Sequence, residues 1–265
     1  MCDLVLSHQD GMSATLTLNQ PAKRNPISSA MRAALIGALE LLRQDKSIRS
    51  VILTGAGNTF CSGLDLETLN FPAENADSES ISAENLADSQ SIRDFYDYLM
   101  RYPKPLIAAV NGPAVAGGAG VALVCDLTIL SEIASFCFSE VRLGFVPAIV
   151  GVYLQSSIGI KKAKELMLSA RTVSARESLS LGLADQVVAN GQLLAECKER
   201  AAKLTKNGPE ALSATKLLLA QQFCHNTQHA MDLAVELNSR TRSSSECKEG
   251  VRAFLGHDVP RWCKE

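Results

Sequence analysis

Apolar residues in the first half of the chain fall into short runs, separated by longer stretches in which apolar and polar residues alternate with a helical period. The runs Leu4–Leu6 and Ala14–Leu18 flank the dipeptide Asp10-Gly11 and predict a β-hairpin. Ser28 can then cap an amphipathic helix whose apolar face runs from Met31 to Leu42. This order of elements is typical of a chain that builds a sheet and covers it with helices.

Three further apolar runs predict buried strands, at residues 51–54, 106–110 and 127–130. Helices between apolar strands favour βαβ units with parallel pairing, and therefore an α/β fold. From Val150 onward the pattern changes to one helix after another, broken only by a short extended piece at 185–188. The segment 72–90 is rich in Ala, Ser, Asn, Asp and Glu, which predicts a mobile surface loop or a mobile lid over a pocket.

Two glycine-rich turns follow predicted strands. After residues 106–110 the chain reaches Gly117 and Gly118 and then continues as a short apolar helix, whose first turn leaves backbone N–H groups open to an anion. A second turn, Ser62-Gly63-Leu64, follows the strand at 51–54. Two such turns could direct two N–H groups at one oxygen, which is the arrangement of an oxyanion hole.

Composition removes several classes of function. The 265 residues carry a net charge of −2 and are 46% hydrophobic, which supports one sizeable core and gives no reason to expect a nucleic-acid or membrane partner. No apolar run approaches the length of a membrane span, and the first residues do not form a targeting signal, so a cytoplasmic protein is expected.

The remaining motif candidates are weak. The eight cysteines include no Cys-x-x-Cys pair and are expected to be reduced. Cys224-His225 with His229 offers too few ligands to predict a metal site. Gly118-Ala119-Gly120 lacks the third glycine of a dinucleotide turn, and no histidine is placed to activate Cys61 or Ser62 as a nucleophile.

Glu140 is the carboxylate that stands out. It follows the extended apolar piece 136–139 and opens a short turn in mostly apolar company, where desolvation can raise its pKa and suit it to acid and base catalysis. The alternative is an ordinary glutamate at the start of a helix, favoured there by the helix dipole.

The chain resembles the crotonase (enoyl-CoA hydratase/isomerase) family over almost its whole length. Five pieces in the family's order carry the resemblance: residues 18–25 (LNQPAKRN), 60–65 (FCSGLD), 111–118 (NGPAVAGG), 125–126 (CD) and 139–144 (SEVRLG). The resemblance implies an α/β spiral of ββα units in residues 1–195 and a helical C-terminal region in residues 196–265, which forms a homotrimer or a dimer of trimers. It also implies a coenzyme A thioester as substrate and no separate cofactor, since the coenzyme is part of the substrate.

Motif positions of the family carry over to particular residues. The oxyanion hole falls on the N–H groups of Leu64 and Gly117, with Glu140 as acid and base. The substrate-binding and coenzyme-binding positions that the resemblance implies are Ala22, Lys23, Arg24, Gly63, Asp65, Leu66, Gly118 and Phe254. A lysine that follows the last phenylalanine in relatives is replaced here by His257.

The main departure from the family concerns a second carboxylate. Hydratases of the two-glutamate type carry one glutamate where this chain has Gly120 and another at the place of Glu140. A glutamate introduced at position 120 is expected to project into the same cavity as Glu140. One carboxylate suits a double-bond shift between C2 and C4, which favours a Δ3,Δ2-enoyl-CoA isomerase.

The sequence around Glu140 favours a hydratase instead. Residues 139–148 resemble the bacterial branch assigned as methylglutaconyl-CoA hydratase of leucine breakdown, which also tends to have glycine at the place of Gly120. Hydration of an enoyl-CoA, whose acyl group can be branched, is therefore the first prediction. Isomerisation is the alternative, another crotonase reaction is a third, and a non-catalytic acyl-CoA-binding or assembly protein is the last.

Overall fold

Six strands form the main sheet, in the spatial order β1-β2-β3-β4-β6-β9. The computed structural model describes residues 3–68 and 78–263. All neighbouring pairs are parallel except β1 and β2, which form the predicted hairpin. The strands of this sheet are β1 Val5–Asp10, β2 Ser13–Leu18, β3 Ser50–Gly55, β4 Leu106–Val110, β6 Leu127–Ser131 and β9 Gln186–Val188. The predicted strands and their parallel βαβ connections are confirmed.

A second, smaller sheet is built from strands that follow β4 and β6 along the chain. It contains β5 (Pro113–Val115), β7 (Ser135–Cys137) and β8 (Thr172–Ser174), with β5 and β7 parallel and β7 and β8 antiparallel. Strand β8 is absent from the sequence-based expectation, because three residues of which one is buried give no recognisable period. This sheet matters because β5 leads into the turn at Gly117 and β7 leads into η3, which begins at Glu140.

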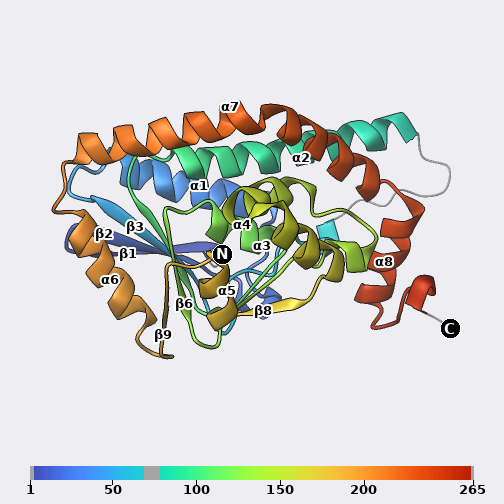
Figure 1. The fold of residues 1–265 in the computed structure, drawn as a ribbon, viewed down its shortest axis with the longest axis horizontal. Helices are drawn as coiled ribbons and strands as arrows, with labels where there is room; N and C mark the ends of the chain where they lie inside the picture. Colours follow the sequence, from blue (N-terminus) through green and yellow to red (C-terminus); the bar gives the residue numbers. More distant parts are fainter. Residues whose placement is uncertain (1–2, 69–77, 264–265) are drawn as a thin grey trace.

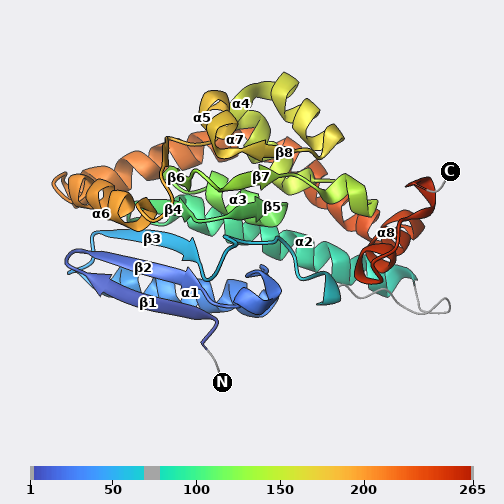
Figure 2. The ribbon, with the colours of Figure 1, turned by 90° about the horizontal axis from the view of Figure 1, so that it is seen from below.

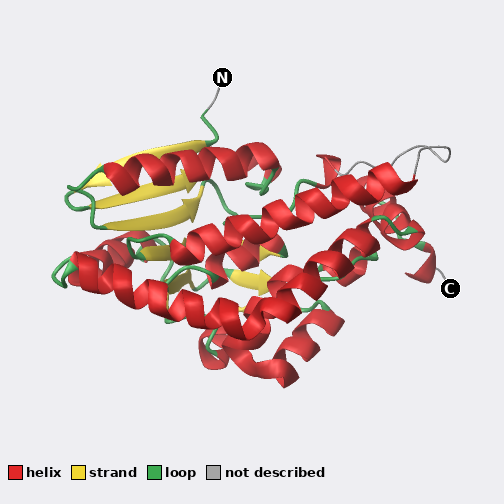
Figure 3. Ribbon diagram, turned by 90° about the horizontal axis from the view of Figure 1, so that it is seen from above, coloured by secondary structure: helices red, strands yellow, loops and turns green. Residues whose placement is uncertain are grey.

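The described residues form eight α-helices, most of which lie over the sheets (Figure 1). They are α1 Ser29–Gln44, α2 Ser78–Arg101, α3 Gly117–Leu123, α4 Ala148–Ser169, α5 Ala175–Leu181, α6 Leu193–Leu204, α7 Pro209–Arg242 and α8 Ser245–Leu255. Short 3-10 turns are η1 Pro21–Lys23, η2 Leu66–Thr68, η3 Glu140–Leu143 and η4 Arg261–Cys263. Figure 3 shows α1, α2 and α7 side by side above the strands, and α7 packs along both α2 and α4. In the described part of the chain, no helix is both long and apolar enough to cross a membrane.

Strands β3 and β4 are buried on both faces, which explains their continuous apolar runs. Successive side chains of a strand point to opposite faces of its sheet. Ile52 of β3 and Ile107 of β4 accordingly pack under α6, whereas Leu53 of β3 and Ala108 of β4 join the larger core beneath α1 and α2. Figure 2 shows α6 at one end of the molecule and α8 at the other.

Helix α1 begins where the sequence predicts, because the Ser28 hydroxyl accepts a hydrogen bond from the N–H of Met31 at 3.1 Å. The expectation of a loop over 72–90 is wrong from residue 78 onward, where α2 has already begun; residues 72–77 lie outside the described residues. Tertiary contacts hold this polar part of α2 in the helix. Asp88 forms ion pairs with the buried Arg32 at 2.6 Å and the buried Arg242 at 2.8 Å, so α2 is fastened to α1 and α7.

Candidate active site

A cavity of about 600 Å³ lies between the two glycine turns, η3 and the end of α8. Its walls come from segments that are far apart in the sequence. The residues carried over from the family that line it are Ala22, Lys23, Arg24, Leu64, Asp65, Leu66, Gly117, Glu140 and Phe254. The fold therefore brings nine of the predicted site residues to one cavity.

Gly63 and Gly118 do not line the cavity but lie behind its wall, where the two turns touch. A β-carbon at Gly118 would lie 2.4 Å from the carbonyl oxygen of Cys61, and one at Gly63 would lie 2.9 Å from the carbonyl oxygen of Val115. Only glycine permits this contact of backbone with backbone. A parallel bridge between Cys61 and Ala114 continues it, so the two turns are fixed relative to each other.

The orientation of the Gly117 N–H follows from its own peptide unit. The carbonyl of that unit, Ala116 O, accepts hydrogen bonds from the N–H groups of Ala119 at 3.0 Å and Gly120 at 3.2 Å in the first turn of α3. N–H and C=O point in opposite directions in a trans peptide, so the Gly117 N–H points away from α3. Ala116 adopts φ 50° and ψ −121°, a conformation that strains a residue with a β-carbon.

The Leu64 N–H is oriented in the same way. The carbonyl of its peptide unit, Gly63 O, accepts a hydrogen bond from the N–H of Ile27 at 2.7 Å, which directs the Leu64 N–H to the opposite side. Neither the Leu64 N–H nor the Gly117 N–H has a hydrogen-bond acceptor among the described residues. The N–H groups of Leu64 and Gly117, which line the same cavity, are thus both left available to a ligand.

Glu140 is the buried carboxyl of the cavity. It is the first residue of η3, only 5% exposed, and its Oε2 atom has no hydrogen-bond partner among the described residues. Burial raises the pKa of Glu140 from 4.5 to about 7, because the charged form loses its hydration. Glu140 does stand at the start of a short helix, as the alternative had it, but it is buried there. A carboxyl with this pKa can both give and take a proton near neutral pH.

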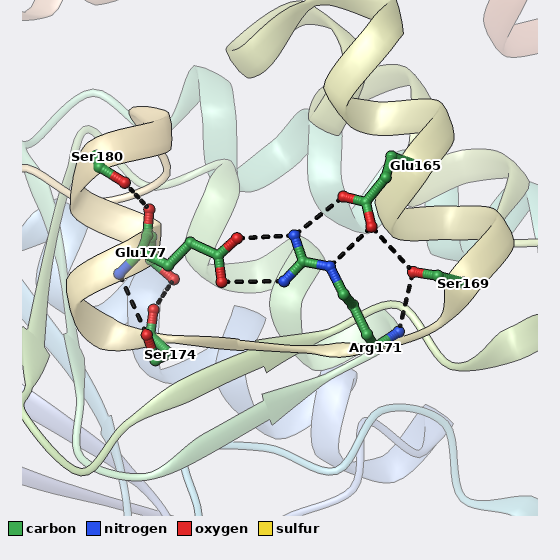
Figure 4. Close-up of polar contacts among 7 residues, drawn as sticks. Glu165, Ser169, Arg171, Ser174, Glu177 and Ser180 are labelled. Atoms are coloured by element: carbon green, nitrogen blue, oxygen red, sulfur yellow. Dashed lines mark hydrogen bonds and ion pairs between the residues drawn. The ribbon is translucent and has the colours of Figure 1, made fainter.

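An ion-pair network centred on Arg171 joins α4 to α5 (Figure 4). The Arg171 guanidinium bridges Glu165 of α4 and Glu177 of α5, each at 2.7 Å. These carboxylates raise the pKa of Arg171, and Arg171 lowers theirs. The preceding carbonyl, Ala170 O, accepts a hydrogen bond from Arg142 of η3 at 2.6 Å. The network therefore fixes the segment between α4 and β8 against which η3 rests.

Charged residues stand at the rim near η1 and η2. Lys23 Nζ lies 2.5 Å from Glu67 Oε2 and 3.8 Å from Asp65 Oδ2, and these contacts raise the pKa of Lys23. Arg24 lines the same rim and forms no ion pair with a described residue. Phe254 of α8 completes the rim with its ring about half exposed.

Tyr96 of α2 is the site residue that sequence reasoning missed. It is 2% exposed, lines the cavity, and donates a hydrogen bond from its hydroxyl to Gly117 O at 2.7 Å. A β-carbon at Gly120 would lie 2.8 Å from both Cζ and Oη of Tyr96. A glutamate at position 120 could therefore reach the cavity of Glu140 only if the Tyr96 ring moved aside. Tyr96 belongs to no motif, so only the packing of α2 on α3 reveals it.

Cys61 offers no reactive thiolate beside this cavity. Cys61 is fully buried, and burial raises the pKa of its thiol to about 12, which leaves it protonated. Across residues 3–68 and 78–263, no three His, Cys, Asp or Glu side chains are grouped so that they could hold a metal ion.

Comparison with known proteins agrees with this architecture. The family model described as enoyl-CoA hydratase/isomerase matches residues 9–265. A Thermus thermophilus protein provisionally named an enoyl-CoA hydratase is 41% identical over 254 residues, covering 96% of this chain and 98% of its own. The 1,2-epoxyphenylacetyl-CoA isomerase of Escherichia coli is 31% identical over 268 residues, covering 99% of each chain.

Solved structures show the same likeness. The crystal structure of an enoyl-CoA hydratase from Mycobacterium avium matches with a TM-score of 0.86 at 27% identity, covering 99% of this chain and 100% of the other. The chain therefore belongs to the enoyl-CoA hydratase/isomerase family, whose members act on acyl-CoA thioesters. The predicted family and fold class are confirmed.

Proposed function

We propose that this protein adds water across the C2–C3 double bond of a 2-enoyl-CoA thioester. The observation that carries the proposal is one cavity that holds both a buried carboxyl, Glu140, and the outward N–H groups of Leu64 and Gly117. The thioester carbonyl would accept hydrogen bonds from both N–H groups. One such donor contributes about 3 kcal/mol to the stabilisation of an oxyanion in a transition state.

Glu140 can carry out both proton transfers of this reaction. In its ionised form it takes a proton from water while the water oxygen forms a bond to C3. The π electrons of C2=C3 move toward C1, and the thioester oxygen becomes an enolate oxygen held by Leu64 and Gly117. Protonated Glu140 then gives its proton to C2, the carbonyl re-forms, and the carboxylate is regenerated. A pKa of about 7 suits a group that must both accept and release a proton in one cycle.

The coenzyme part of the substrate would lie along η1. Arg24 is the cation available to a phosphate, because Lys23 is already paired with Glu67 and Asp65 and would have to exchange partners. Gly63 and Gly118 support the turns, and Phe254 and Leu66 border the entrance. We propose no separate cofactor, since the coenzyme enters with the substrate.

Isomerisation of a 3-enoyl-CoA is the second candidate, and the Gly120–Tyr96 contact favours it. The wall of α3 carries no carboxylate beside Gly117, so Glu140 faces the substrate without a second acidic group from that helix. Moving one proton between C2 and C4 needs only one carboxylate and the same two N–H donors. Relatives with hydratase names and a relative with an isomerase name are both consistent with this site.

Two finer features remain proposals. A branched, methylglutaconyl-like acyl group rests on the sequence around Glu140. Self-association into trimers through the helical region is supported by a run of exposed apolar side chains on α7, at Leu217, Leu218 and Leu219.

The function is tested with Glu140→Gln, which keeps the size of the side chain and removes its acid and base chemistry. We expect hydration of crotonyl-CoA to fall by at least about 10²-fold while affinity for the acyl-CoA stays within a few-fold. Glu199→Gln is the matched control, because Glu199 is exposed on α6 and pairs with Lys203 at 2.6 Å, away from the cavity. Near-normal turnover of Glu140→Gln would contradict the catalytic assignment, and absence of turnover in every form would favour a binding protein.

A further inference from the structure

The space in which a side chain at position 120 would stand is occupied from another helix. Tyr96 projects from α2 across α3, and its Oη atom lies 2.8 Å from where a β-carbon of residue 120 would be and 3.1 Å from where one of residue 117 would be. The hydroxyl therefore lies beside the first turn of α3, on the side of the helix that faces the cavity.

Neighbouring rings hold Tyr96 in this position. Its ring meets Tyr153 of α4 edge to face, with centroids 5.6 Å apart, and Phe95 at 5.7 Å. Tyr153 in turn stacks on Phe223 of α7 at 5.2 Å. An aromatic side chain packed on this scale is well ordered, so the hydroxyl oxygen has a defined place in the cavity wall.

Among the described residues, no group donates a hydrogen bond to the Tyr96 hydroxyl oxygen. Its proton is donated to Gly117 O at 2.7 Å, and the phenolic oxygen can still accept a hydrogen bond. Burial, with smaller contributions from Cys61 and Glu140, raises the pKa of Tyr96 well above its usual value. The phenol thus stays protonated over the working pH range, and its oxygen offers an acceptor position next to the cavity.

Adding water to C3 requires that a water molecule be held in one orientation, whereas moving a proton at C2 does not. The water must direct a lone pair at C3 while its proton points to Glu140, and a second acceptor for its other proton fixes that orientation. Two other carboxylates of the cavity, Asp65 and Glu67, stand at the rim beside Lys23. Within the described residues, the uncharged oxygen of Tyr96 is the acceptor that lies next to position 120, where two-glutamate hydratases carry a carboxylate.

We propose that the Tyr96 hydroxyl is the second acceptor for the attacking water and takes the role that a carboxylate at position 120 would have. This rests on the proposed hydratase function. Oη accepts one O–H of the water, Glu140 Oε2 accepts the other, and the proton that moves goes to Glu140. Tyr96 is thereby a catalytic residue for hydration, whereas forming the enolate from a saturated acyl-CoA needs only Glu140, Leu64 and Gly117.

The experiment compares two reactions in Tyr96→Phe, which keeps the ring and removes only the oxygen. The first reaction is hydration of crotonyl-CoA, and the second is exchange of the C2 hydrogens of butyryl-CoA with deuterium from solvent. We expect hydration kcat to fall by at least about 10-fold, as for a misplaced reactant, and exchange to stay within about 3-fold of wild type, since no water attacks in it.

Tyr102→Phe is the matched control. Tyr102 lies next to the end of the same helix, is 1% exposed, and donates its hydroxyl to a backbone carbonyl, Leu39 O, at 2.9 Å, but it does not line the cavity. Both rates should match wild type in this variant. Its loss of stability calibrates how much a buried hydroxyl contributes to folding alone.

Two results would overturn the proposal. If hydration and exchange fall in Tyr96→Phe by the same factor, the hydroxyl serves only to hold the Gly117 turn. If neither falls, the ring only fills space. Failure of the proposed function looks different, because wild-type protein would then show no hydration of crotonyl-CoA or no dependence of it on Glu140.

Discussion

Replacing Gly120 by alanine tests whether the Tyr96 ring occupies the space beside residue 120. The new β-carbon would lie 2.8 Å from Cζ and Oη of Tyr96, whereas ordinary contacts begin at 3.4 Å. The ring must therefore retreat by roughly 0.6 Å, against Tyr153 and Phe95. Because interiors are close-packed, this displacement is transmitted to the neighbouring rings and costs free energy.

The expected magnitude follows from two opposing effects. Overpacking a core typically costs about 1–3 kcal/mol, whereas alanine in place of glycine within a helix stabilises by about 1 kcal/mol. Gly120→Ala should thus lower the free energy of unfolding by roughly 0–2 kcal/mol. Gly37→Ala is the control, because Gly37 lies inside α1 with nothing within 4 Å of its β-carbon position. That change should stabilise by about 0.5–1 kcal/mol.

Thermal unfolding of both variants at one protein concentration measures the difference. One kcal/mol corresponds to about 2–4 °C for a chain of this size, so the melting temperature should fall by about 0–8 °C in Gly120→Ala and rise by about 1–4 °C in Gly37→Ala. The same Gly120→Ala preparation should lose hydration more than C2 exchange, since the Tyr96 hydroxyl moves with its ring. Equal stabilisation by both alanines would refute the reasoning, because it would show that Tyr96 does not occupy this space.

Two further predictions concern Glu140 and Gly117. Burial raises the pKa of Glu140 from 4.5 to about 7, so the folded protein holds this proton more tightly than the unfolded chain does. The resulting contribution to the free energy of unfolding is complete below about pH 4.5 and is lost as the pH rises through about 7. Urea unfolding should show Glu140→Gln gaining up to about 3 kcal/mol on wild type between pH 4.5 and pH 8, and a pH-independent difference would argue against a buried carboxyl. Gly117→Pro removes one proposed oxyanion donor at the first position of α3, where proline is tolerated, and a variant shown by circular dichroism to be folded should hydrate crotonyl-CoA about 10²-fold more slowly. Normal rates in that folded variant would place the oxyanion donors elsewhere.

Local patterns in the sequence determined the sheet, its helical connections, the two glycine turns and Glu140, whereas the other predicted cavity residues came from the resemblance to the family. Residues 106–110 form a strand because every side chain is apolar and buried, and the glycine turn after β5 opens the short helix α3. Glu140 was also recognisable, because a lone carboxylate directly after an apolar strand is carried into the interior with that strand. Each of these inferences uses neighbours within a few positions along the chain.

The tertiary structure decided the features that depend on distant segments. A polar stretch became the start of α2 because Asp88 meets two buried arginines from α1 and α7. Lys23 is paired with Glu67, a contact across 44 positions. The space next to Gly120 is filled by Tyr96, whose place depends on how α2 packs on α3 and α4. Sequence spacing fixes which side chains share one helix or strand, but only packing decides which side chain of another element fills the space that a glycine leaves.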